Sequence, residues 1–201
     1  MTTTKAVASR KEILITGFGG QGIVLAGQIV GRAASLGDHT ESTLTQSYGP
    51  EARGGACSAQ VIISDDAIHY PYVRSPDVLV CMSQGGFDKY APMLREDSIL
   101  LTDQDLVRAE SVNTAEFFTI PATRMAEELG RKMMANIVMV GFLTAISRAL
   151  SVDAARGAVL DSVPKGTEKL NTAAFTKGYD YGVAVLKGRR KKAEGKKGAQ
   201  A

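Results

Sequence analysis

A glycine-rich run near the start of the chain is the pattern best suited to binding a ligand. It reads Gly17-Phe18-Gly19-Gly20-Gln21-Gly22, and the glycines at 17, 19 and 22 match the GxGxxG spacing of nucleotide-binding turns. An apolar run at 12–16 precedes it and a helical pattern at 23–34 follows it. Glycines let the backbone approach a ligand closely, and free N–H groups at a helix start favour phosphate. We therefore predict that Gly19, Gly20, Gln21 and Gly22 bind a phosphate-bearing cofactor; the alternative is a turn that only packs the helix onto the strand.

A dinucleotide is one candidate ligand for this turn. An NAD site would need an acidic residue about 20 positions further on, at the end of the second strand. Glu41 lies near that offset, but it falls inside the extended segment and not at its end, where Gln46 and Ser47 stand. The dinucleotide interpretation is therefore weakened, and a different phosphate-bearing cofactor fits at least as well.

The turn-rich segment 47–55 is a second candidate site, because it places an arginine directly before two glycines. A guanidinium can form paired hydrogen bonds to a phosphate or carboxylate, and glycines admit close backbone approach. The alternative is a solvated turn in which Arg53 pairs with Glu51. We add to the predicted cofactor-binding residues Ser47, Tyr48, Arg53, Gly54 and Gly55.

Other polar residues are weaker candidates. His39 and His69 are isolated in the sequence, and we interpret each as an ordinary surface or hydrogen-bonded histidine. Asn136 opens an apolar helical run, where it could be a buried polar anchor or an N-cap. We predict no catalytic residue and no metal ligand in this chain.

The cysteine content limits the redox chemistry that the chain can carry. There are two cysteines, Cys57 and Cys81, without CxxC spacing, and two histidines. A cubane iron–sulfur cluster takes about four thiolates, and a structural zinc takes about four Cys or His ligands. The chain alone therefore has too few ligands for either centre. Because no secretory signal precedes the cysteines, we expect a reducing, cytoplasmic location.

Alternating patterns predict the fold class. Short apolar or β-branched runs predict strands at 12–16, 39–46, 58–64, 78–82, 98–101 and 117–120. Periodic runs predict helices at 23–34, 85–94, 122–129, 135–150, 152–160 and 169–186. Such alternation is typical of an α/β fold with a mostly parallel sheet and helices on both faces. The fifteen uncharged residues between Lys132 and Arg148 fall short of the about 20 that a bilayer span needs, so we expect a core helix and no membrane partner.

Charge divides the chain into a body and a basic tail. Residues 187–201 hold seven Lys or Arg and one Glu, whereas the whole chain has a formal charge of +3, so the body is acidic. A basic segment rich in Gly and Ala cannot bury a core, and we predict a flexible leader at 1–11, one domain at 12–186 and a basic flexible tail at 187–201. The tail offers only sequence-independent attraction, so we expect no specific nucleic-acid partner.

Four segments, taken in order, resemble the gamma subunit family of 2-oxoacid:ferredoxin (acceptor) oxidoreductases. They are ILITGFGGQGIVLAG at 13–27, SYGPEARGGACSAQVIIS at 47–64, SPDVLVCMSQ at 75–84 and IPATRMAEELG with NIVMVG between 120 and 141. The glycine motif alone is a weak match, but its combination with the RGG loop and the PDV strand is specific. The resemblance implies a Rossmann-like, gamma-type oxidoreductase domain over 12–186.

As the resemblance implies, the whole enzyme decarboxylates a 2-oxoacid on thiamine diphosphate, passes electrons through iron–sulfur clusters to ferredoxin or another acceptor, and forms an acyl-CoA. Thiamine diphosphate and the clusters would lie on partner subunits, namely alpha, beta and a ferredoxin-like delta subunit. This chain would help to bind coenzyme A through its glycine turn and Arg53, and would be inactive alone. The identity of the 2-oxoacid stays open.

Two other classes of function stay open on the sequence. A stand-alone NAD(P)- or FAD-dependent oxidoreductase explains the glycine motif but leaves the RGG loop unused. A subunit that serves only in assembly would have a glycine turn that binds nothing.

Overall fold

The structure, a computed structural model, describes residues 10–48, 56–110, 112, 114 and 116–198. The strands are β1 (Arg10–Phe18), β2 (Glu41–Tyr48), β3 (Ala56–Ser64), β4 (Val78–Cys81), β5 (Ile99–Asp103) and β6 (Glu116–Ile120). The α-helices are α1 (Ile23–Arg32), α2 (Gln84–Tyr90), α3 (Ala122–Glu128), α4 (Ala135–Ser147), α5 (Val152–Ser162) and α6 (Glu168–Gly198). A π-helical turn, η1 (Ala33–Gly37), extends α1; 3-10 turns extend α2 as η2 (Ala91–Met93) and precede α4 as η3 (Lys132–Met134).

These strands form one sheet in the order β2-β3-β1-β4-β5-β6. The pairs β1–β4, β4–β5 and β5–β6 are parallel, whereas β3 runs antiparallel to both β1 and β2. Every strand except β3 therefore points the same way, and their carboxyl ends meet at one edge of the sheet, the carboxyl edge. The predicted α/β fold with a mostly parallel sheet is confirmed.

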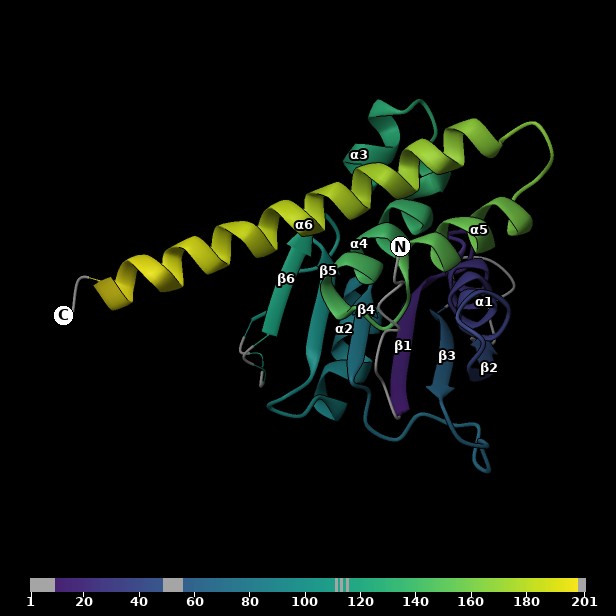
Figure 1. Ribbon diagram of the computed structural model, residues 1–201, viewed down its shortest axis with the longest axis horizontal. Helices are drawn as coiled ribbons and strands as arrows, with labels where there is room; N and C mark the ends of the chain where they lie inside the picture. Colours follow the sequence, from purple (N-terminus) through teal and green to yellow (C-terminus); the bar gives the residue numbers. More distant parts are fainter. Residues whose placement is uncertain (1–9, 49–55, 111, 113, 115, 199–201) are drawn as a thin grey trace.

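Helices cover both faces of the sheet, but unevenly. Alternate residues of β1 point to opposite faces, so Ile13 and Ile15 join one core while Leu14 joins another. The larger core lies under α1, α3, α4, α5 and α6, whereas the smaller one is closed by Phe87 of α2 and by connecting segments. Figure 1 shows α2 behind the sheet and the other helices in front of it. Both faces of the central strands are thus buried, which explains their almost wholly apolar sequences.

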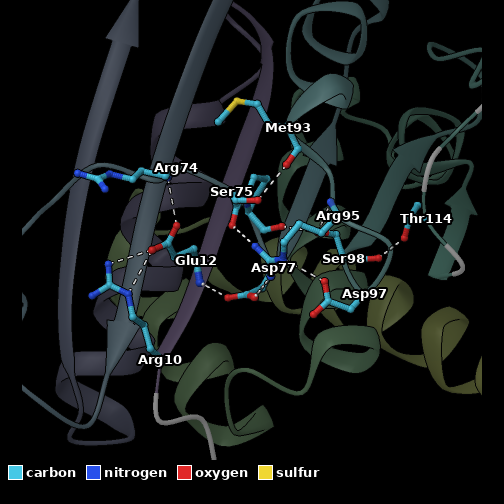
Figure 2. A network of polar contacts seen from close by, with 11 residues as sticks. Arg10, Glu12, Arg74, Ser75, Asp77, Met93, Arg95, Asp97, Ser98 and Thr114 are labelled. Atoms are coloured by element: carbon cyan, nitrogen blue, oxygen red, sulfur yellow. Dashed lines mark hydrogen bonds and ion pairs between the residues drawn. The ribbon is translucent and has the colours of Figure 1, made fainter.

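A polar network fixes the amino ends of the central strands (Figure 2). Asp77, directly before β4, accepts a hydrogen bond from the backbone N–H of Glu12 in β1 at 2.8 Å. Its other carboxylate oxygen pairs with Arg95 at 2.7 Å, and Arg95 also donates to the carbonyl of Ser75 at 2.7 Å. The Ser75-Pro76-Asp77 segment therefore sets where β4 begins relative to β1.

The ends of several elements differ from the sequence expectation. β1 begins at Arg10, inside the segment expected to be a leader. β2 ends at Tyr48, later than expected, and β3 begins at Ala56, earlier than expected. The expected end of the last helix at Leu186 is wrong, because α6 continues to Gly198. Lys and Arg are good helix formers, so a helix that starts on a packed segment can continue through a basic sequence that contributes no apolar side chain to a core. The division of the chain at 187 stays a prediction.

α6 is held to the rest of the fold by close packing and by one arginine. A Cβ on Gly178 would collide with the carbonyl oxygen of Val138 in α4, so the two helices approach at glycine. Further along, Arg189 pairs with Glu116 at 3.2 Å, and its guanidinium lies 3.6 Å from the ring centre of Phe118 in β6. Beyond this point α6 extends past β6, away from the sheet (Figure 1).

We predict that removing residues 190–201 leaves folding and complex assembly intact, because Arg189 and its contacts with Glu116 and Phe118 are retained and the described side chains at 190–192 are exposed. The measurements are the unfolding midpoint of the truncated chain and its co-purification with partner subunits. As a comparison, Arg189→Ala in the full chain should lower stability by about 0.5–1 kcal/mol through loss of the ring contact. A truncated chain that folds but no longer joins its partners would make the end of α6 an interface.

Candidate functional site

The glycine turn lies at the carboxyl edge, between β1 and α1. The backbone N–H of Gln21 donates to the carbonyl of Phe18 at 3.1 Å, and Gly20 has a φ of 96°. A positive φ at the third position of such a turn is the type II pattern, which favours glycine. Gly22, with a φ of 71°, is the N-cap of α1. The predicted sequence of strand, glycine turn and helix is confirmed, and the positive φ favours glycine at both positions.

Gln21 ties this turn to a neighbouring strand. Its Oε1 accepts from the backbone N–H of Phe18 at 2.6 Å, and its Nε2 donates to the carbonyl of Met82 at 2.8 Å. Met82 directly follows β4, so the side chain spans the crevice between the carboxyl ends of β1 and β4. A Cβ on Gly17 would collide with Gln21 Oε1, so the first glycine of the motif makes room for this amide.

Asn136 holds the turn from the other side. It is 3% exposed, and its Nδ2 donates to the carbonyl of Gly22 at 3.1 Å. A Cβ on Gly22 would collide with the Asn136 side chain. The N-cap of α4 is Met134, so Asn136 is a buried anchor and not a cap.

The start of α1 is suited to an anion. Within the described residues no side chain caps this helix, and its first turn contains no acidic residue. Uncapped N–H groups and the positive end of the helix dipole, about half a unit charge, favour a phosphate there. Phe18, Gly19 and Gly20 are exposed, and no described atom lies within 4 Å of where a Cβ of Gly20 would point.

The second predicted segment meets the glycine turn only in part. Tyr48 aligns with Cys57 of β3, which aligns with Gly17 of β1, so Ser47 and Tyr48 lie at the same edge as the turn. Tyr48 is 64% exposed and donates to Gln46 at 3.0 Å. The three predicted residues Arg53, Gly54 and Gly55 lie outside the described residues. Their binding role stays a prediction, as does that of the glycine turn.

The geometry does not favour a dinucleotide. The strand beside β1 on this side is the antiparallel β3. A dinucleotide-binding fold has its parallel second strand at that position. Glu41 starts β2, opposite Ser64, and therefore lies at the amino edge, away from the glycine turn. Gln21 also bridges the crevice that a dinucleotide would occupy.

A hollow of about 560 Å³ lies further along the carboxyl edge, between α2 and the segment after β5. Three carboxylates line it, from Asp88, Asp105 and Glu110, against the single guanidinium of Arg108. Their charge disfavours a phosphate group. An anionic ligand is therefore better placed at the glycine turn than here.

The thiols and imidazoles are not arranged for redox or metal chemistry. Burial raises the pKa of both thiols, and the charge of Asp88 raises the pKa of Cys81 further. Cys57 belongs to the larger core and Cys81 to the smaller one, so the sheet separates them. Both histidines are exposed, and in the part of the chain that the structure describes no three His, Cys, Asp or Glu side chains could share a metal ion. Nor does that part contain a helix long and apolar enough to cross a membrane.

The chain is similar to known proteins in both sequence and fold. The family model described as pyruvate ferredoxin/flavodoxin oxidoreductase matches residues 12–181. The 2-oxoglutarate synthase subunit KorC of Methanocaldococcus jannaschii is 50% identical over 179 residues, covering 88% of this chain and 96% of its own. The gamma subunit of a keto/oxoacid ferredoxin oxidoreductase from Geobacter sulfurreducens is 39% identical, with a TM-score of 0.77 over 87% of this chain and 99% of that subunit.

A more distant structure shares the fold alone. It is the 2-oxoglutarate:ferredoxin oxidoreductase of Magnetococcus marinus, solved with 2-oxoglutarate, coenzyme A and succinyl-CoA bound. Its TM-score is 0.77 at 19% identity, over 89% of this chain but 32% of that one.

The fold and the glycine turn thus define a Rossmann-like domain in which one antiparallel strand replaces the usual parallel neighbour of β1. The chain belongs to the pyruvate ferredoxin/flavodoxin oxidoreductase family. The prediction of a gamma-type subunit of a 2-oxoacid:ferredoxin oxidoreductase is confirmed, and the comparisons support this function over a stand-alone nucleotide-dependent enzyme.

We predict that Asn136→Ala lowers the free energy of unfolding by about 1–3 kcal/mol, because it removes a buried hydrogen bond and leaves a cavity beside the turn. Urea denaturation of the isolated chain measures the change. The control is Gln28→Ala on the exposed face of α1, which should change stability by less than about 0.5 kcal/mol. Equal effects of the two substitutions would contradict an anchoring role for Asn136.

Proposed function

We propose that this chain supplies part of the coenzyme A site of a 2-oxoacid:acceptor oxidoreductase complex in the cytoplasm. The observation that carries the proposal is the uncapped start of α1, which adjoins the exposed glycine turn. Tyr48 and Ala56, the described residues on either side of the segment that contains Arg53, lie at the same edge. A guanidinium beside helix amides is suited to the pyrophosphate of coenzyme A.

Positioning is the contribution that these residues would make. When bound, coenzyme A supplies the thiol that accepts the acyl group. Gly19, Gly20 and Gly22 would offer backbone N–H groups to its phosphates, and Arg53 would neutralise charge. Fixing the nucleotide end lowers the entropic cost of bringing the thiol to the site of acyl transfer. The chain's own groups need no proton transfer for this task.

The remaining chemistry would belong to partner subunits. Thiamine diphosphate and iron–sulfur clusters are proposed on alpha, beta and ferredoxin-like delta subunits. For the clusters, the reason is that Cys57 and Cys81 of this chain lie on opposite faces of the sheet. Ferredoxin or a similar protein is proposed as the external acceptor. We infer 2-oxoglutarate as the substrate of the complex, because the half-identical Methanocaldococcus jannaschii relative is a 2-oxoglutarate synthase subunit.

We predict that the purified chain alone is colourless and catalytically silent with every 2-oxoacid. The assembled complex should reduce its acceptor faster with 2-oxoglutarate than with pyruvate or branched-chain 2-oxoacids. Absorbance spectra and coenzyme A-dependent acceptor reduction measure both points. Turnover by the single chain would refute the proposal that partner subunits carry the redox and decarboxylation chemistry. Preference for another 2-oxoacid would refute only the substrate assignment.

We predict that Gly20→Val and Arg53→Ala each raise the KM for coenzyme A in the assembled complex. A valine at a φ of 96° is strained, and its side chain would occupy the space through which a ligand approaches. Loss of an Arg–phosphate hydrogen bond costs about 1.5–3 kcal/mol, which corresponds to a roughly ten- to hundredfold higher KM. Steady-state kinetics with varied coenzyme A provide the measurement.

Two controls accompany these variants. Decarboxylation or cluster reduction measured without coenzyme A should be unchanged, because that chemistry lies on other chains. Gly85→Ala, at a carboxyl-edge glycine with no described atom within 4 Å of its added Cβ, should leave the KM unchanged. If both test variants assemble normally and keep the wild-type KM, the glycine turn is a packing device and the coenzyme A site lies elsewhere.

A further inference from the structure

Two side-chain amides, of Gln21 and Asn136, add hydrogen bonds to the backbone of the glycine turn. Within it, the turn has one backbone hydrogen bond, from Gln21 to Phe18. Two glycines with positive φ would otherwise leave this segment with many accessible conformations. A binding site made of backbone N–H groups binds more tightly if those groups are already fixed before the ligand arrives, because less entropy is lost on binding.

Gln21 restrains the turn at two points. The amide oxygen accepts from Phe18 N–H, where β1 ends, and the amide nitrogen donates to Met82 O, where β4 ends. The planar amide of one side chain thus joins the ends of the two strands that flank the crevice. In the chain, Gln21 stands between Gly20 and Gly22. Asn136 bonds to the carbonyl of Gly22, whereas the Gln21 side chain bonds to the backbone N–H of Phe18, directly before Gly19 and Gly20.

Glycine at position 17 leaves room for this amide. Gly17 has no Cβ where the Gln21 oxygen lies, and a Cβ there would also come within 2.6 Å of Ile23 in α1. A side chain at position 17 would therefore displace the Gln21 amide from its hydrogen bonds with Phe18 and Met82.

We propose that Gln21 is a positioning residue that presets the backbone N–H groups of the turn for the phosphates of coenzyme A. It acts through the backbone of the turn, and its own amide bonds to Phe18 and Met82. This inference rests on the proposed coenzyme A site and names the residue that keeps that site in its binding shape.

The test uses Gln21→Met, which keeps the length of the side chain but removes both hydrogen bonds. Its matched control is Gln28→Met, on the exposed face of α1, the helix that follows the turn. Hydrogen exchange of the Phe18 and Gln21 backbone amides, whose N–H groups are hydrogen-bonded within the turn, is measured in the assembled complex without coenzyme A. We expect exchange to be roughly tenfold faster in Gln21→Met and unchanged in Gln28→Met.

Kinetics in the same complexes complete the experiment. We expect Gln21→Met to raise the KM for coenzyme A by roughly tenfold while kcat at saturating coenzyme A stays within about twofold, because the bound ligand restores the shape of the turn. Unchanged amide exchange would overturn the positioning role. An unchanged KM in Gln21→Met beside a raised KM in Gly20→Val would also overturn it, while leaving the coenzyme A site in place. An unchanged KM in both variants would instead remove the proposed function on which the inference rests.

Discussion

The arrangement at the carboxyl edge depends on how closely β1, β4 and α4 approach the turn that links β1 to α1. Three glycines permit this approach: at Gly17 and Gly22 an added Cβ would collide with Gln21 and Asn136, and Gly20 supplies the positive φ. The space that the glycines leave is filled by two amide side chains, which bond to backbone groups of the turn and of β4. The same contacts that pack the core therefore also shape a candidate ligand site.

The antiparallel strand β3 changes what a Rossmann-like fold can bind. It occupies the place next to β1 where a dinucleotide fold has a parallel strand with an acidic residue at its end. Its reversal also brings Tyr48 and Ala56 to the carboxyl edge, on either side of the segment with Arg53. Tyr48 and Ala56, the described residues at this edge, carry no carboxylate of the kind that binds a ribose in a dinucleotide fold.

The composition of the chain agrees with a role in binding and not in electron transfer. The two cysteines are buried, on opposite faces of the sheet, with pKa values raised by burial. Burial therefore favours the neutral thiol at both positions. Redox chemistry in the proposed complex falls to other subunits, while this chain contributes an anion-suited helix start.

Sequence patterns by themselves determined the order and type of the elements, because periodicity is set by local geometry: the six predicted strands, the glycine turn and the helices that follow it all occur in the structure. Element ends were less well determined. The continuation of α6 to Gly198 was missed, since a basic segment gives no burial signal. Only the tertiary structure decided which residues hold the turn. The place of Gln21 in the glycine run predicted a ligand contact, which stays a prediction, whereas the bond of its amide to Met82, 61 residues away, could be found only in the structure. Asn136 reaches Gly22 across 114 residues. Contacts between residues so far apart in the chain follow from how strands and helices pack, and no local spacing encodes them.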